Sequence, residues 1–134
     1  MAHILIIEDY RDTRDVTKLI LADAGHSVSS ASDGIRGLYL AARDQPDLIL
    51  MDLALPRLDG WAATQRLKAY PLTRHIPVVA FTAHVTQEDV ARASVAGCAA
   101  VISKPFEIDT LLNTVATVLN PSAPAWRERA VGRD

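Results

Sequence analysis

Five short apolar runs alternate along the chain with five stretches of helical period, and this alternation constrains the fold more than any other feature. The runs have the length of β-strands: HILII at 3–7, HSVSSA at 26–31, DLILM at 47–51, IPVVAF at 76–81 and AAVIS at 99–103. A helical stretch follows each of them. Parallel neighbours in a sheet need such crossover connections. The order therefore predicts an α/β fold, a doubly wound five-stranded parallel sheet with five helices.

The helical stretches carry signals for their faces and their ends. Two of them show an apolar face, which is expected to pack on the sheet: Val16, Leu19, Ile20 and Ala24 in DVTKLILADAG, and Ile35, Leu38 and Ala42 in DGIRGLYLAARD. The other helices are expected in DGWAATQRLKAY, TQEDVARASVAG and FEIDTLLNTVATVL. The expected N-caps are Asp33, Asp59 and Thr86, and the glycines that end helices are Gly25 and Gly97.

Length and composition fit one domain. The chain has 134 residues, of which 49% are hydrophobic, so residues 1–119 are expected to form a domain with a core. The segment 120–134, NPSAPAWRERAVGRD, has no apolar period and is expected to be a flexible C-terminal tail. The formal net charge of −2 creates no overall field that would favour nucleic acid or an anionic membrane.

Cysteine content and the N-terminus indicate the compartment. Cys98 is the one cysteine, so an internal disulfide is excluded, and it is expected to fill core space in a reducing cytoplasm. The apolar run at the N-terminus meets Glu8 and Asp9 too early for a signal peptide or a membrane span.

Polar residues follow four of the predicted strands. Glu8 and Asp9 end the first, Asp52 the third, Thr82 and Ala83 the fourth, and Lys104 the fifth. The carboxyl ends of parallel strands meet at one edge of the sheet, where ligands of such folds bind. Each residue alone has an ordinary structural explanation, as a turn former, a helix cap or a surface side chain. Complementary groups at four strand ends together predict a site.

The chemistry of these groups points to a phosphoryl group and a metal ion. Two carboxylates ~4 Å apart repel by about 4 kcal/mol at an effective dielectric constant of about 20, so a cation is needed. Lys104 supplies one positive charge, and an all-oxygen set with few protein ligands suits Mg²⁺. Lys104 and the Thr82 hydroxyl match the oxygens of a transferred phosphoryl group. Asp52 is then the predicted nucleophile, which forms an acyl phosphate.

The chain resembles a response-regulator receiver domain of the chemotaxis-regulator type over about residues 2–119. The resemblance is carried by ILIIEDYRDTRD, PDLILMDLALPRLDGW, IPVVAFTAH and AGCAAVISKPF, in the family's order and spacing. It implies a flavodoxin-like topology with strand order 2-1-3-4-5. It also implies that a histidine kinase or a histidine phosphotransfer protein phosphorylates Asp52 in a two-component or phosphorelay system.

The resemblance further implies roles for the site residues. Glu8, Asp9, Asp52 and the backbone carbonyl of Ala54 would hold Mg²⁺. Lys104, Thr82 and the Ala83 N–H would contact the phosphoryl oxygens, and the bond before Pro105 would be cis. A downstream protein would bind the face formed by 86–97, 99–103 and 106–119, with the receiver a monomer or a weak dimer and no enzyme toward other substrates.

Three positions bear on how this chain would differ from other members of the family. Val101 stands where members usually carry Tyr or Phe, which puts the usual aromatic switch in doubt. Ala54 and His84 occupy the two positions that modulate dephosphorylation in the family.

Other functions are weighed against this one. A phosphatase of the haloacid-dehalogenase kind needs a second Asp where this chain has Ala54, and a flavodoxin-like phosphate site would be repelled by Glu8 and Asp9. The chain is alternatively a receiver fragment of a hybrid histidine kinase or of a longer regulator. The sequence does not identify the kinase, the output partner, the oligomeric state or whether Asp134 is the native C-terminus.

Overall fold

The structure, a computed structural model, describes residues 1–55, 57–83, 85–120 and 127–128. The predicted alternation of strands and helices is confirmed. The strands are β1 (His3–Ile7), β2 (Ser27–Ala31), β3 (Leu48–Asp52), β4 (Val78–Ala83), β5 (Ala100–Lys104) and β6 (Arg127–Glu128). The helices are α1 (Arg11–Asp23), α2 (Gly34–Asp44), α3 (Gly60–Ala69), α4 (Gln87–Ala96) and α5 (Ile108–Leu119).

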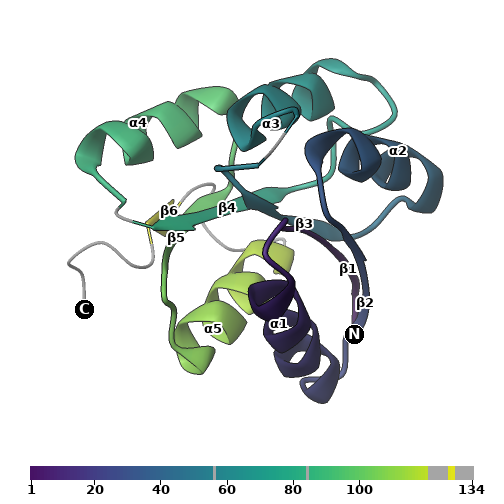
Figure 1. The fold of residues 1–134 in the computed structure, drawn as a ribbon, viewed down its shortest axis with the longest axis vertical. Coiled ribbons are helices and arrows are strands. Elements are labelled where there is room, and N and C mark those ends of the chain that lie inside the picture. Colours follow the sequence, from purple (N-terminus) through teal and green to yellow (C-terminus); the bar gives the residue numbers. More distant parts are fainter. Residues whose placement is uncertain (56, 84, 121–126, 129–134) are drawn as a thin grey trace.

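The sheet has the order β2-β1-β3-β4-β5-β6, and all of its pairs are parallel. The five predicted strands lie in the predicted order 2-1-3-4-5. Helices α1 and α5 cover one face, and α2, α3 and α4 cover the other (Figure 1). β3 lies in the middle of this sandwich with every residue buried, which explains its continuous apolar run.

A two-residue strand, β6, pairs with β5 at the edge of the sheet, within the segment that was expected to lack regular structure. Ala100 and Val101 are its partners. The edge of a sheet presents unpaired N–H and C=O groups to any neighbouring chain, and an apolar period is not needed to pair with them. The rest of the predicted tail lies outside the described residues, apart from Asn120.

The predicted apolar face of α1 is confirmed at Ile20, which is half-buried and packs against the core, but it is wrong at Val16, Leu19 and Ala24. Thr17 and Leu21 are buried, whereas Val16 is 53% exposed and Leu19 is 71% exposed. Thr17 can replace an apolar residue in the core because its hydroxyl donates to the Thr13 carbonyl at 2.7 Å. The face of α1 that was expected to be buried therefore presents apolar side chains to the surface.

The predicted face of α2 is confirmed at Leu38, which is half-buried and packs against the core, but it is wrong at Ile35. Ile35 is 48% exposed, and the buried positions are Gly34, Gly37, Leu40 and Ala41. A Cβ added to Gly37 would overlap the Ile7 side chain, so α2 packs on β1 through a glycine. The fit of Gly37 against the Ile7 side chain, together with the buried Leu40 and Ala41, selects this side of the helix.

The predicted helix ends are confirmed. Asp33, Asp59 and Thr86 are N-caps whose side chains accept backbone N–H groups of the first turn. Gly25 and Gly97 follow or end helices with φ of 102° and 100°. Cys98 is buried in the core between the sheet and the helices on the α3 side, as predicted.

Candidate functional site

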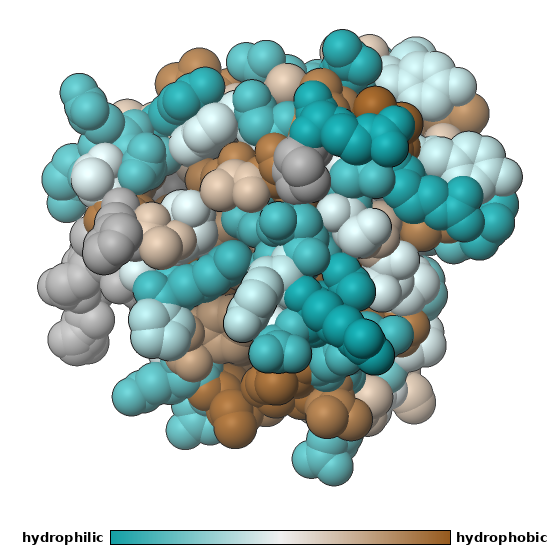
Figure 2. Space-filling model, in the orientation of Figure 1, coloured by the Kyte–Doolittle hydropathy of each residue, from teal (hydrophilic) through white to brown (hydrophobic). Residues whose placement is uncertain are grey.

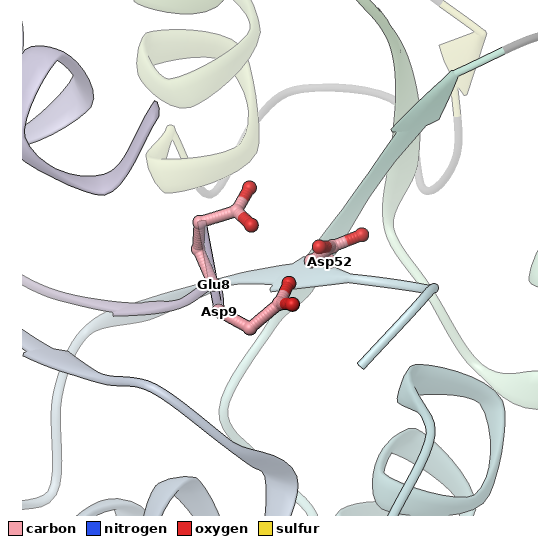
Figure 3. A group of neighbouring side chains, drawn as sticks. All are labelled: Glu8, Asp9 and Asp52. Carbon is pink, nitrogen blue, oxygen red and sulfur yellow. The ribbon is translucent and has the colours of Figure 1, made fainter. Parts of the chain in front are cut away.

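Three carboxylates meet at the carboxyl ends of β1 and β3 (Figure 3). Glu8, Asp9 and Asp52 each offer an oxygen, and these oxygens lie within 4.8 Å of one another. β1 and β3 are hydrogen-bonded neighbours, although Ile7 and Met51, which pair in register, are far apart in the sequence. The acids thus lie where the strand order reverses, between β1 and β3, which is the ligand-binding position of open α/β sheets.

Asp52 is the last residue of β3 and is held rigidly. The residue is 3% exposed, and its Oδ1 accepts the Ala54 N–H at 3.0 Å. The backbone below it is packed tightly, since Leu53 N–H donates to the Phe81 carbonyl and Gly60 N–H donates to the Leu53 carbonyl, both at 3.2 Å. A carboxylate in this position has little freedom to rotate away from its neighbours.

Glu8 is fully buried and ionises with difficulty. Desolvation by burial raises the pKa of its carboxyl from about 4.5 to about 7, although the Lys104 ammonium and the Tyr10 N–H both favour the charged form. Tyr10 N–H donates to Oε2 at 2.9 Å, and Lys104 Nζ lies 2.8 Å from Oε1. Arg14 also reaches this strand end, where it donates to the Glu8 backbone carbonyl at 3.0 Å.

Lys104 completes the cluster from β5. Its Nζ lies 2.8 Å from Glu8 Oε1 and 3.5 Å from Asp52 Oδ2. β4 separates β5 from β3, and the lysine crosses it over the ring of Phe81, with Nζ 4.9 Å from the ring centre. An aromatic face attracts an ammonium group, so Phe81 supports the extended lysine on its way to the acids.

The remaining predicted residues surround this cluster. Thr82, half-buried, and Ala83, exposed, end β4, and they pair with Ser103 and Lys104 of β5. The Lys104–Pro105 bond is cis, as the resemblance implies. His84 lies outside the described residues. The structure thus gathers Glu8, Asp9, Asp52 and Lys104, while the roles assigned to Thr82, Ala83 and the Ala54 carbonyl stay predictions.

The acid cluster fits a divalent cation by its chemistry. Its donors are carboxylate oxygens, the ligands that Mg²⁺ prefers, and the single ammonium of Lys104 leaves a net negative charge. Asp9 is exposed, so the site is open to solvent on one side. An open site suits Mg²⁺, which keeps several of its waters.

Sequence reasoning missed the apolar groove beside the site. A groove of about 430 Å³ is lined by Val16 and Thr17 of α1, by Ala83, and by Lys104, Pro105 and Phe106. Apolar side chains gather over α1 and α5 in the lower part of Figure 2, and Val16, Leu19 and Ile108 are at least half exposed. This surface was missed because the sequence pattern assigned Val16 and Leu19 to the buried face of α1, whereas both are exposed.

The family model for the response regulator receiver domain matches residues 4–116. The chain is a member of the response regulator receiver family. This receiver is 34% identical over 116 residues to the polar-differentiation response regulator DivK of Brucella anthropi, with 87% of this chain and 94% of DivK covered. It is 39% identical over 119 residues to the DNA-binding dual master transcriptional regulator RpaA of Synechocystis sp., with 89% of this chain covered.

A solved structure supports the same assignment. The receiver domain of a sensor histidine kinase from Pseudomonas aeruginosa superposes with a TM-score of 0.81 at 33% identity, covering 88% of this chain and 97% of that one. That domain has a magnesium ion coordinated in its active site cleft. The chain spans 49% of the length of RpaA, so it matches both a short regulator and part of a longer one. None of the helices in the described ranges combines the length and apolar character needed to cross a membrane.

Proposed function

We propose that this receiver is the phosphoacceptor of a two-component or phosphorelay system. A histidine kinase or a histidine phosphotransfer protein phosphorylates Asp52 in the cytoplasm, in a Mg²⁺-dependent reaction, and the phosphorylated domain binds a downstream protein. The observation that carries the proposal is the meeting of Asp52 with Glu8, Asp9 and Lys104 at the edge of the sheet.

The chemistry follows from the residues present. A carboxylate oxygen of Asp52 attacks the phosphorus of a phosphohistidine, a P–O bond forms, and the P–N bond breaks with its electron pair returning to the imidazole nitrogen. Lys104 Nζ, 3.5 Å from Asp52 Oδ2, is placed to neutralise charge on the phosphoryl oxygens. Thr82 and the Ala83 N–H offer hydrogen bonds from β4. Mg²⁺ would be held by Glu8, Asp9, Asp52 and the Ala54 carbonyl, and when bound it would supply further positive charge for the transferred group.

The groove beside α1 supports docking of a protein donor. A phosphohistidine must reach Asp52 from the carboxyl edge of the sheet, and the groove opens there, next to Lys104 and Ala83. Val16 and Leu19 continue its apolar surface along α1. A helical donor with an apolar stripe would bury these side chains while its histidine faces Asp52.

The output of the domain is binding rather than catalysis on another substrate. The expected surface is formed by α4, β5 and α5, because β5 carries both Lys104 at the site and Val101 beneath α4. The same proposal includes that the receiver is a monomer or a weak dimer. The phosphatase alternative is weaker, since Ala54 contributes only its backbone N–H to Asp52.

Acetyl phosphate with Mg²⁺ tests the phosphoacceptor. Intact-mass measurement should show one added phosphoryl group on the wild type and none on Asp52→Asn. Asp12→Asn is the matched control, because Asp12 is an exposed acid on the first turn of α1 outside the acid cluster, and it should be labelled normally. Full labelling of Asp52→Asn would refute the assignment.

A receiver within a longer protein is the second candidate. The match to half of RpaA favours it, whereas the match to nearly all of DivK favours a single-domain regulator. The complete reading frame in the genome distinguishes them.

A further inference from the structure

The ring of Phe81 lies beside the path that the Lys104 side chain takes to the acids. Lys104 belongs to β5 and Phe81 to β4, the strand that separates β5 from β3. Lys104 Nζ lies 4.9 Å from the ring centre, 2.8 Å from Glu8 Oε1 and 3.5 Å from Asp52 Oδ2. The ammonium is therefore held by two carboxyl groups and by one uncharged aromatic face.

The ring itself is held rigidly. Phe81 is 2% exposed and belongs to the core cluster on the face of the sheet that α1 and α5 cover (Figure 1). Phe106 packs edge-on against it, with the ring centres 6.2 Å apart and 73° between the ring planes. The backbone of Phe81 pairs in register with Asp52, and its carbonyl accepts the Leu53 N–H at 3.2 Å. The face of the ring therefore has a fixed place relative to the phosphoacceptor.

A fixed ring restricts the positions open to a flexible lysine. The lysine side chain has four rotatable carbons, and freezing it at a phosphoryl group costs rotamer entropy. The side chain of Lys104 is 21% exposed, so part of it is in contact with solvent. Because the ring face attracts the ammonium, it favours the conformers in which Nζ stays near Asp52. Some of the ordering of Lys104 is thus complete before a phosphoryl group arrives.

We propose that Phe81 is a positioning residue for phosphoryl transfer, which holds the Lys104 ammonium where the phosphoryl oxygens of a group on Asp52 will lie. This inference rests on the function proposed above and adds to it a residue with no polar side-chain atom. Phe81 forms no bond to the phosphoryl group and acts through Lys104. Its contribution comes from the charge distribution of the ring face, in addition to the volume that the ring fills in the core.

A fluorinated ring separates these two contributions. Phe81→trifluorophenylalanine removes most of the negative charge of the ring face and changes the ring's shape little. In the reaction with acetyl phosphate and Mg²⁺, an Asp52 oxygen attacks the phosphorus, and the P–O bond to acetate breaks with its electron pair on acetate. Intact mass follows the rate of labelling. The fluorinated protein should be labelled about 3- to 10-fold more slowly than the wild type, which corresponds to ~0.6–1.4 kcal/mol.

A double-mutant cycle with Lys104→Ala shows whether the ring acts through the lysine. Fluorination should change the labelling rate of Lys104→Ala by less than about 2-fold, because the ammonium that the ring attracts is absent. Equal slowing in both backgrounds would overturn the inference, since it would indicate a role in packing alone. An unchanged rate in the wild-type background would overturn it as well.

Lysine side-chain NMR in EDTA tests the contact without phosphorylation. The ring current of Phe81 should move the ε-methylene protons of Lys104 upfield of those of Lys18 and Lys68, and Phe81→Leu should reverse this shift. The signal is assigned by its loss in Lys104→Ala, and an ordinary shift in the wild type would overturn the inference. If acetyl phosphate and Mg²⁺ failed to label the wild type, the proposed function would fall, and the inference with it. A labelled wild type whose rate is insensitive to fluorination overturns the inference alone.

Discussion

The fully buried Glu8 should make the metal-free protein less stable as the pH rises through neutrality. Its pKa is raised from about 4.5 to about 7, chiefly by desolvation. Between these values the folded chain binds more protons than the unfolded chain, so the free energy of unfolding falls with increasing pH. At about 1.4 kcal/mol for each pH unit between the two pKa values, the total loss is about 3 kcal/mol. The stabilisation that protonated Glu8 contributes is fully present below pH ~4.5 and is lost above pH ~7.

Urea unfolding in EDTA between pH 5 and pH 8.5 measures this effect. The comparison is with Glu8→Gln, in which only the Glu8 contribution is removed. The wild type should lose up to about 3 kcal/mol relative to the variant as the pH rises. Mg²⁺ should restore stability to the wild type above pH 7, and its affinity should fall by up to about tenfold per pH unit below that, because the metal competes with the proton on Glu8.

Two results would refute this reasoning. Parallel pH profiles for the wild type and Glu8→Gln in EDTA would show that Glu8 ionises as easily in the fold as in the unfolded chain. A wild type that gains stability relative to the variant with rising pH would show that the Lys104 ion pair, at 2.8 Å, outweighs desolvation.

Three further substitutions test the site and its surroundings. Asp9→Asn should weaken Mg²⁺ binding yet leave the protein at least as stable as the wild type in EDTA, because it relieves repulsion; thermal melts with EDTA and with Mg²⁺ measure both effects. Gly60→Ala should cost about 3 kcal/mol or more in urea unfolding, because the added Cβ meets the backbone of Asp52 and Leu53. Val101→Phe should cost about 1–3 kcal/mol, because Val101 is fully buried, and a stability equal to the wild type would show space for a ring.

The alternation of strands and helices and the place of the site were predictable because they depend on local signals and on topology, whereas the strand order was implied by the family resemblance. Asp52 follows an apolar run that only a strand covered on both faces explains, and its position at the carboxyl edge then follows from the parallel arrangement. Helix caps such as Asp59 were predictable because a side chain bonds a backbone N–H within its own turn. Predicting these features does not require knowing which helix and sheet surfaces are in contact.

The helix faces were only partly predictable, because tertiary contacts decide them. Thr17 is buried since a local hydrogen bond satisfies its hydroxyl, and Gly37 is buried since Ile7 leaves no room for a side chain. Neither threonine nor glycine counts as an apolar position, so the helical pattern does not mark either one as buried. Val16 and Leu19 were consequently assigned to the core, although they form part of the exposed surface beside the site.

Phe81 shows most clearly what the pattern of charges leaves out. The sequence places Lys104 and the acids at strand ends, but two strands of the sheet separate the start of the lysine side chain from β1 and the Glu8 carboxylate it reaches. The lysine covers this span over the ring of Phe81, which β4 places beside Asp52 in register. Phe106 packs edge-on against the same ring at 6.2 Å and fixes its orientation. The position of the ammonium beside Glu8 and Asp52 therefore depends on an apolar residue that no motif of acids and bases identifies.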